Sequence, residues 1–176
     1  MTVDPYLDPG SGVLRNRLGI VDQQRLREVE ADLTFAVLAD LGTRILPVFG
    51  DLYPWAGEIR VVAIARSDPF CLPQHIEAYS AEVFGRLAKE RYLRGLDRDG
   101  FVDRLTHYLA EVNAIHPFRE GNGRCQRAFF RQLGQDAEWR IDWSNLESDD
   151  NDRASMASLR GDNGPLRDLL DVLVTR

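Results

Sequence analysis

The sequence is poor in cysteine, has no long apolar run and carries no excess of positive charge, and each absence excludes a class of protein. Its two cysteines, Cys71 and Cys125, lie far apart without metal-ligand spacing, which favours a reducing cytoplasm over a disulfide framework. No stretch approaches a membrane span, and the first residues lack the features of a secretory signal. A net charge of −6 argues against a general nucleic-acid surface. We therefore expect a cytoplasmic protein without membrane or direct nucleic-acid contacts.

Most of the 176 residues show helical spacing, and the length suits a single domain over residues 1–176. Asp22 is placed to cap a helix that ends at Gly42. A second helix is expected over about residues 74–94. A third ends at His116, and its apolar residues are spaced by four, three, four and three: Phe101, Leu105, Tyr108, Val112 and Ile115. The predicted fold class is therefore mainly α.

Other parts of the chain depart from this spacing. Ile59 to Ile64 is rich in β-branched residues and is followed by the turn-forming Ser67-Asp68-Pro69, which predicts a β-hairpin. Residues 139–143 indicate a short connector, and the acidic stretch 148–152 indicates a loop or a helix start. Pro165 opens a final helix, whose apolar positions are Leu166, Leu169, Leu170, Leu173 and Val174.

The most informative stretch is His116-Pro117-Phe118-Arg119-Glu120-Gly121-Asn122-Gly123-Arg124-Cys125-Gln126-Arg127. Gly121 and Gly123 lack a Cβ, so the backbone between them can turn its N–H groups around an anion. The residues that follow have the pattern of a first helical turn, whose positive end also attracts phosphate. This arrangement suits a di- or triphosphate.

Side chains of the same stretch complete a phosphate site. Arg124 and Arg127 are three residues apart, so they project from one helix face as bidentate donors for successive phosphates. Glu120 offers a hard oxygen ligand, and Mg²⁺ bound to phosphates needs only one or two protein carboxylates. His116, just upstream, is the natural general base.

The stretch resembles the Fic family motif, His-x-Phe-x-Asp/Glu-Gly-Asn-Gly-Arg-x-x-Arg, at every specified position. Such a pattern is far more specific than a lone glycine-rich loop. Asp4-Pro5-Tyr6 with Leu14 to Ile20 looks like the amino-terminal segment of bacterial Fic toxins, and Tyr53 to Arg60 resembles the family's Trp-Ala-Gly-x-x-Arg element. The resemblance covers roughly the whole chain.

The resemblance implies a Fic fold, a helical bundle with a short β-hairpin flap over the active site. The flap would span about residues 59–72, and the catalytic loop and helix start would span residues 116–127. In this family an extended segment of the target protein is thought to add to the flap as a strand. The resemblance therefore assigns target positioning to Ser67, Phe70 and Cys71.

The implied activity is transfer of AMP from ATP to a Tyr, Thr or Ser hydroxyl of a target protein. Glu120 would bind Mg²⁺, and His116 would take the hydroxyl proton. The phosphates of ATP would be held by the glycine loop and the helix start, which are Gly121, Asn122, Gly123, Arg124 and Arg127.

Neighbouring residues receive structural interpretations. Phe118 is expected to be an apolar anchor, and Arg119 stands at a position that the motif leaves open, so we expect a surface charge there. Cys125 has no base and orienting partner for nucleophilic chemistry, which favours packing. His75 and His107 have no partners at ligand spacing.

Regulation is indicated by a missing motif. Many Fic proteins are inhibited by a Ser/Thr-x-x-x-Glu-Gly/Asn helix whose glutamate pairs with the second motif arginine. No Ser or Thr of this sequence has a Glu four residues later. The chain therefore resembles the toxin class that a separate small antitoxin inhibits, and the antitoxin would supply the glutamate to Arg127. Toxins of this class often modify topoisomerase subunits, whereas secreted relatives modify host GTPases.

The sequence departs from the family pattern at one place, and it leaves two other functions open. Between Gly42 and Phe49 the chain lacks the extra helical stretch usual in the family, which could expose Ile45, Leu46 and Val48. The motif reads phosphates rather than the base, so a Fic-fold transferase with another donor, such as UTP, would use the same residues. A nucleotide-binding module without turnover would also use them.

Overall fold

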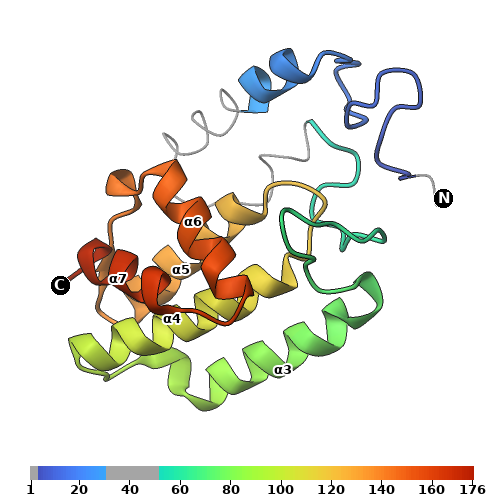
Figure 1. Cartoon of the computed structure of the whole chain (residues 1–176). Helices are drawn as coiled ribbons and strands as arrows, with labels where there is room; N and C mark the ends of the chain where they lie inside the picture. The colour runs from blue at the N-terminus through green and yellow to red at the C-terminus, as the bar shows by residue number, and fades with distance from the viewer. Residues whose placement is uncertain (1–3, 31–51) are drawn as a thin grey trace. The chain divides into compact units, whose positions relative to one another are not determined.

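The computed structural model describes residues 4–30 and 52–176, which divide into two compact units (Figure 1). The first unit comprises the chain up to Val62 together with Phe118–Gly121, and the second comprises Ala63–Pro117 and Asn122–Arg176. None of the helices described combines the length and the apolar character that crossing a membrane requires.

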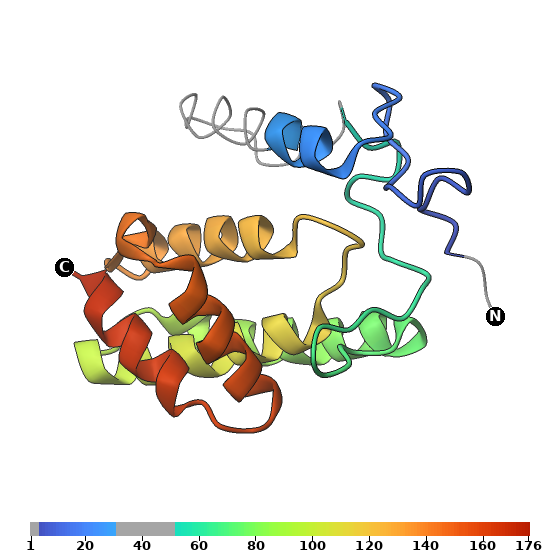
Figure 2. The same ribbon diagram turned by 45° about the horizontal axis from the view of Figure 1, so that its top comes forward.

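The second unit is helical and is organised around α4, residues Arg98–Ile115. In both ribbon views α3, residues Ile76–Lys89, runs beside α4 (Figures 1 and 2). The remaining helices of the unit are α5 (Asn122–Asp136), α6 (Ser148–Leu159) and α7 (Gly164–Leu173). Single 3-10 turns occupy Pro73–His75, Arg91–Leu93 and Trp143–Asn145. The mainly α prediction is confirmed.

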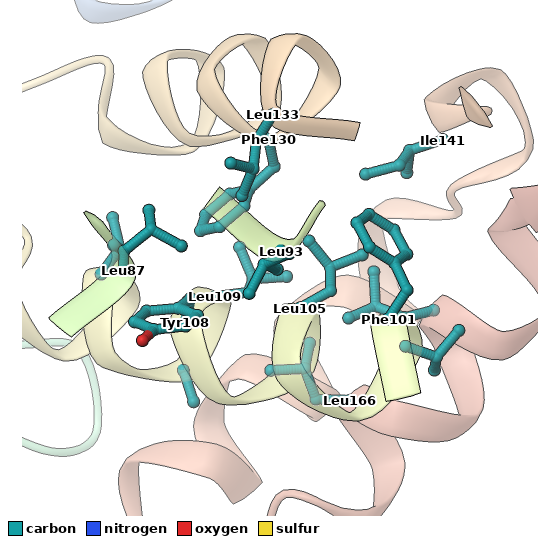
Figure 3. Packing of buried hydrophobic residues seen from close by; sticks show 14 of the residues in the cluster. Leu87, Leu93, Phe101, Leu105, Tyr108, Leu109, Phe130, Leu133, Ile141 and Leu166 are labelled. Carbon is teal, nitrogen blue, oxygen red and sulfur yellow. The ribbon is translucent and has the colours of Figure 1, made fainter. Parts of the chain in front are cut away.

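The core of this unit lies on the apolar face of α4 that the spacing predicted. Phe101, Leu105 and Tyr108 are fully buried. Figure 3 shows Phe130 and Leu133 of α5 pointing toward α4. The predicted positions Val112 and Ile115 are also buried, and burial extends beyond the predicted face to Val102, Leu109 and Ala110, because other helices pack on α4 from a second side.

The ends of α4 and the chain terminus add polar and backbone contacts. The Asp97 carboxylate caps α4 by accepting from the Gly100 N–H. Strand β1, Arg140–Ile141, pairs antiparallel with β2, Val174–Thr175. The connector prediction for residues 139–143 missed this strand, because its pairing partner lies at the other end of the carboxy-terminal third.

The predicted helix over residues 74–94 is shorter than expected. α3 ends at Lys89, and Arg91, Tyr92 and Leu93 take φ values of 55, 55 and 62°. This left-handed backbone is unfavourable for residues with a Cβ. Leu93 is nevertheless fully buried in the core, and this burial offsets part of the cost.

The predicted β-hairpin is present only as a tight turn. This turn lies within residues 63–72, which are here called the flap turn. A single antiparallel bridge joins Ala65 to Pro69, and the Phe70 N–H donates to the Ile64 carbonyl over 3.2 Å. Ile59 to Ile64 form no regular strand despite their β-branched side chains, and no described strand pairs with them.

The first unit contains a capped helix and an aromatic cluster. The Asp22 carboxylate accepts from the Arg25 N–H over 2.7 Å, and residues 23–30 are helical, as predicted. Tyr53 stacks on Trp55 at 4.3 Å between ring centroids. The rest of the helix predicted to end at Gly42, and the shortened segment before Phe49, lie outside the described residues.

Candidate active site

His116 stands at the carboxyl end of α4 in a backbone conformation that is uncommon outside glycine. Its φ is 45° and its ψ is 62°, and its N–H donates to the Val112 carbonyl. The Nδ1 atom lies 3.2 Å from the Asn113 carbonyl oxygen. Because a carbonyl only accepts, this contact favours the tautomer with a proton on Nδ1, which makes Nε2 the basic nitrogen.

The flap turn meets this histidine directly. The Phe70 ring stacks on the His116 imidazole, with 3.8 Å between centroids and 18° between planes. The next residue, Cys71, donates its N–H to the Ala114 carbonyl over 2.9 Å. Two of the three residues assigned to target positioning therefore contact the last turn of α4 or its C-cap.

The glycine loop leads into the amino terminus of α5. Gly121 has a φ of 84°, a left-handed backbone that glycine adopts without strain. Asn122 begins the helix and is buried. A Cβ on Gly123 would lie 3.2 Å from the Arg127 Nη1, so the absence of a side chain leaves room for that guanidinium.

Arg124 and Arg127 place two positive charges on the first turns of α5. Burial lowers the pKa of the Arg127 guanidinium below its ordinary value, and the charge of Arg124 lowers it further. Two neighbouring like charges favour the binding of an anion between or beside them, since its negative charge would offset both the burial of Arg127 and its repulsion by Arg124. The helix amino terminus adds to the same field.

Glu120 belongs to the short segment Phe118–Gly121 of the first unit. One oxygen of its carboxylate accepts from the Gly121 N–H over 2.9 Å. The described residues contain no group of three His, Cys, Asp or Glu side chains that could hold a metal. A single hard oxygen donor fits Mg²⁺ that is carried mainly by phosphate oxygens, the way in which nucleotide-bound Mg²⁺ is usually held.

The contacts of Arg119 differ from the surface charge that the sequence led us to expect. Its Nε and Nη2 donate to the Asp4 Oδ2 over 3.2 and 2.9 Å, and only about a fifth of its side chain is exposed. The other oxygen of Asp4 accepts from the Tyr6 N–H. The prediction of a surface charge was wrong, because the motif leaves this position open and its partner lies 115 residues away.

A family model described as the Fic/DOC family matches residues 32–133. The chain belongs to the Fic/DOC family. It is 39% identical to the protein adenylyltransferase VbhT of Bartonella schoenbuchensis over 98% of this chain, although it spans only 38% of VbhT. It is 37% identical to the probable protein adenylyltransferase Fic of Escherichia coli K12, over 98% of this chain and 92% of that protein.

Solved structures agree with the Fic fold. The N-terminal Fic domain of a VirB-translocated Bep effector protein from Bartonella quintana, crystallised with bound ADP, has a TM-score of 0.86 and 26% identity. The alignment covers 97% of this chain and 94% of that domain. BepC from Bartonella tribocorum has a TM-score of 0.85 at 24% identity, covering 97% of this chain and 96% of its own. The predicted family and fold are confirmed.

In this Fic protein the flap turn is tied to α6 by side chains that the sequence pattern did not reveal. Arg160 donates to the Asp68 Oδ2 over 2.9 Å and to the Ser67 Oγ over 3.3 Å. Arg66 pairs with Asp152 over 2.6 Å. Because Arg160 and Asp68 lie 92 residues apart, no local signal could have paired them.

The remaining reactive side chains have structural surroundings. Burial raises the pKa of the Cys125 thiol, which disfavours the reactive thiolate and agrees with packing. Burial also lowers the pKa of His107, whose ring meets the edge of Tyr108 at 5.0 Å. His75 is exposed at the end of a 3-10 turn.

Proposed function

We propose that this Fic protein is a protein adenylyltransferase, which transfers AMP from ATP to a Tyr, Thr or Ser hydroxyl of a target protein. The observation that carries the proposal is His116, held at the end of α4 with its Nδ1 on a carbonyl, one short loop before the charged start of α5. The names of VbhT and the Escherichia coli relative support the activity, and the ADP in the Bartonella quintana domain supports the nucleotide.

The proposed reaction follows from these groups. Nε2 of His116 takes the proton of the target hydroxyl while that oxygen forms a bond to the α-phosphorus of ATP. The bond from the α-phosphorus to the bridging oxygen breaks, and its electron pair leaves with pyrophosphate. Gly121 bends the loop around the phosphates, Asn122 and Gly123 present backbone N–H groups to them, and Arg124 and Arg127 bind the β and γ groups.

Glu120 is the residue that would hold Mg²⁺. Bound there, the ion would neutralise charge on the phosphate oxygens. The N–H of Gly121 orients the Glu120 carboxylate, so the chain itself prepares the acid for this role. Ser67, Phe70 and Cys71 are proposed to position the segment of the target that carries the hydroxyl.

The biological setting belongs to the same proposal. The absence of a Ser/Thr-x-x-x-Glu motif supports a toxin that acts in the cytoplasm and is inhibited by a small antitoxin. The antitoxin would place a glutamate on Arg127, whose half-buried charge favours an acidic partner. A topoisomerase subunit is the proposed class of target.

Transfer of radioactive label from ATP to proteins of a bacterial lysate tests the activity. ATP labelled at the α-phosphate is compared with ATP labelled at the γ-phosphate, and His116→Ala is the control. We expect label only from the α position and only with His116 present. Label from γ alone would indicate phosphoryl transfer, and no label from either would contradict ATP as a donor.

Growth of a bacterial culture tests the toxin role separately. Expression of the chain alone is expected to slow growth, and His116→Ala is expected to remove the effect. Equal growth with both forms would contradict a toxin even if the transfer assay succeeds.

A further inference from the structure

We infer that Phe70 is a positioning residue for His116, so that the flap orients the general base as well as the target. This inference rests on the proposed function, because it assigns Phe70 a part in the same reaction. The contact of interest is between two rings, the phenyl group of Phe70 and the imidazole of His116.

The two contacts on the imidazole restrict different motions. The Asn113 carbonyl holds Nδ1 at one edge of the ring, which selects the tautomer. Phe70 covers one face at 3.8 Å and 18°, which restricts the tilt of the ring plane. The His116 backbone, with a φ of 45°, begins a loop rather than continuing α4, so the helix alone does not hold the side chain.

Phe70 is itself well fixed. Only 7% of it is exposed. Its own N–H donates to the Ile64 carbonyl, and the N–H of Cys71 donates to the Ala114 carbonyl in the last turn of α4. Backbone hydrogen bonds on both residues therefore hold the phenyl ring over the imidazole.

Contacts with α6 extend this support. The Arg160–Asp68 and Arg66–Asp152 pairs attach the tip of the flap turn to that helix. A displacement of the flap turn would carry Phe70 away from the imidazole. The base would then keep its tautomer but lose its orientation, and small losses of alignment are costly in general-base catalysis.

This role predicts an effect on turnover rather than on nucleotide binding. A residue that only docks the target would change the target concentration needed for half-maximal rate. A residue that orients the base lowers the rate that remains when ATP and target are both saturating. Phe70→Leu removes the ring while keeping an apolar side chain in the buried position.

Two measurements on Phe70→Leu test the inference. The first is the proton NMR spectrum of the histidine rings, which is simple because the chain has three histidines. The His116 signals are assigned by their loss in His116→Ala. Protons above an aromatic ring resonate upfield, so the His116 signals are expected to move downfield in Phe70→Leu, while those of His107 stay in place as a check on folding.

The second measurement is the initial rate of label transfer from α-labelled ATP, at rising lysate protein concentration with ATP saturating and at rising ATP concentration with lysate protein saturating. We expect the saturating rate of Phe70→Leu to fall roughly tenfold to a hundredfold, with the half-saturating ATP concentration unchanged. Phe84→Leu is the matched control, because Phe84 is partly exposed on α3 and packs against Phe129. Phe70→Tyr keeps a ring over the imidazole and is expected to retain most of the rate.

Either of two results would overturn the inference. One is an unmoved His116 resonance in Phe70→Leu, which would mean that the rings do not stack. The other is an unchanged saturating rate with only a higher requirement for target. A wild-type enzyme that transfers no His116-dependent label would remove the proposed function and this role together, while the resonance shift would still report the stacking.

Discussion

The core around α4 and the flap turn belong to the same unit, yet different forces hold them. Around α4, side chains such as Phe101 and Leu105 are removed from water completely. The flap turn buries one large apolar side chain, Phe70, and is otherwise held by one bridge, one backbone hydrogen bond to α4, and ion pairs that are partly exposed, as at Arg160 and Asp68. Apolar burial is large and insensitive to salt, whereas exposed pairs are weak and screened. We therefore expect the flap turn to open without the core unfolding.

The largest expected effect is a cavity in the core. Leu105→Ala should lower the free energy of unfolding by about 2 to 5 kcal/mol, because the side chain is fully buried and the space cannot collapse completely. Urea denaturation measures this loss. Val172→Ala, on the exposed side of α7, is the control and should change the value by less than about 0.5 kcal/mol. Equal losses for both would contradict the core assignment.

An added methyl group tests the close approach of α5 to the β1 segment. A Cβ on Gly134 would lie 3.0 Å from the Trp139 carbonyl oxygen and 3.1 Å from Ile141, so Gly134→Ala should cost about 1 to 3 kcal/mol. Gly85→Ala is the control with the opposite sign. A Cβ at Gly85, in helix α3, would meet nothing within 4 Å. Alanine there should raise the free energy of unfolding by about 0.5 to 1 kcal/mol. Changes of the same sign in thermal denaturation would refute this prediction.

A smaller loss is expected at the amino terminus of α4. Asp97→Ala removes the acceptor for the Gly100 N–H and should destabilise the unit by about 1 kcal/mol. Asp97→Asn keeps an oxygen there and should lose much less. Denaturation of both variants at neutral pH separates these outcomes, and equal losses would mean that the cap contributes through charge alone.

The smallest effect on stability is expected in the flap turn. Arg160→Gln should change the free energy of unfolding by less than about 0.5 kcal/mol, because the pair with Asp68 is partly exposed. Hydrogen exchange at the Phe70 and Cys71 amides should nevertheless accelerate, as their support from α6 is reduced. High salt should have a similar effect on the wild type.

Arg153, which lies within α6, provides the matched control for this experiment on its C-cap residue Arg160. Arg153→Gln removes a pair with Asp150 of the same helix and leaves the contacts of the flap turn intact. Its flap amides should exchange at the wild-type rate. Equal acceleration in both variants would show that a general loss of charge on α6, rather than the tie to the flap turn, controls opening.

The sequence predicted more of the core around α4 than of the flap turn, because local spacing reveals the first and distant contacts hold the second. α4 was predicted because its core face repeats every three or four residues, a pattern that neighbouring positions reveal. The flap turn was predicted as part of a hairpin from the β-branched residues 59–64 and the turn-forming Ser67-Asp68-Pro69, but side chains far along the chain, Arg160 and Asp152, also hold it. Strand β1 was missed for the same reason, since its pairing partner is β2.

The motif from His116 to Arg127 combines features that the sequence predicted with features that only the fold decided. The residues alone settled which chemical groups follow one another and that a helix begins after Gly121, because spacing and backbone preference act over a few residues. The fold decided that Phe70 covers His116 and that Arg119 pairs with Asp4. Those contacts join residues distant in sequence, and only the packing of whole elements brings such residues together.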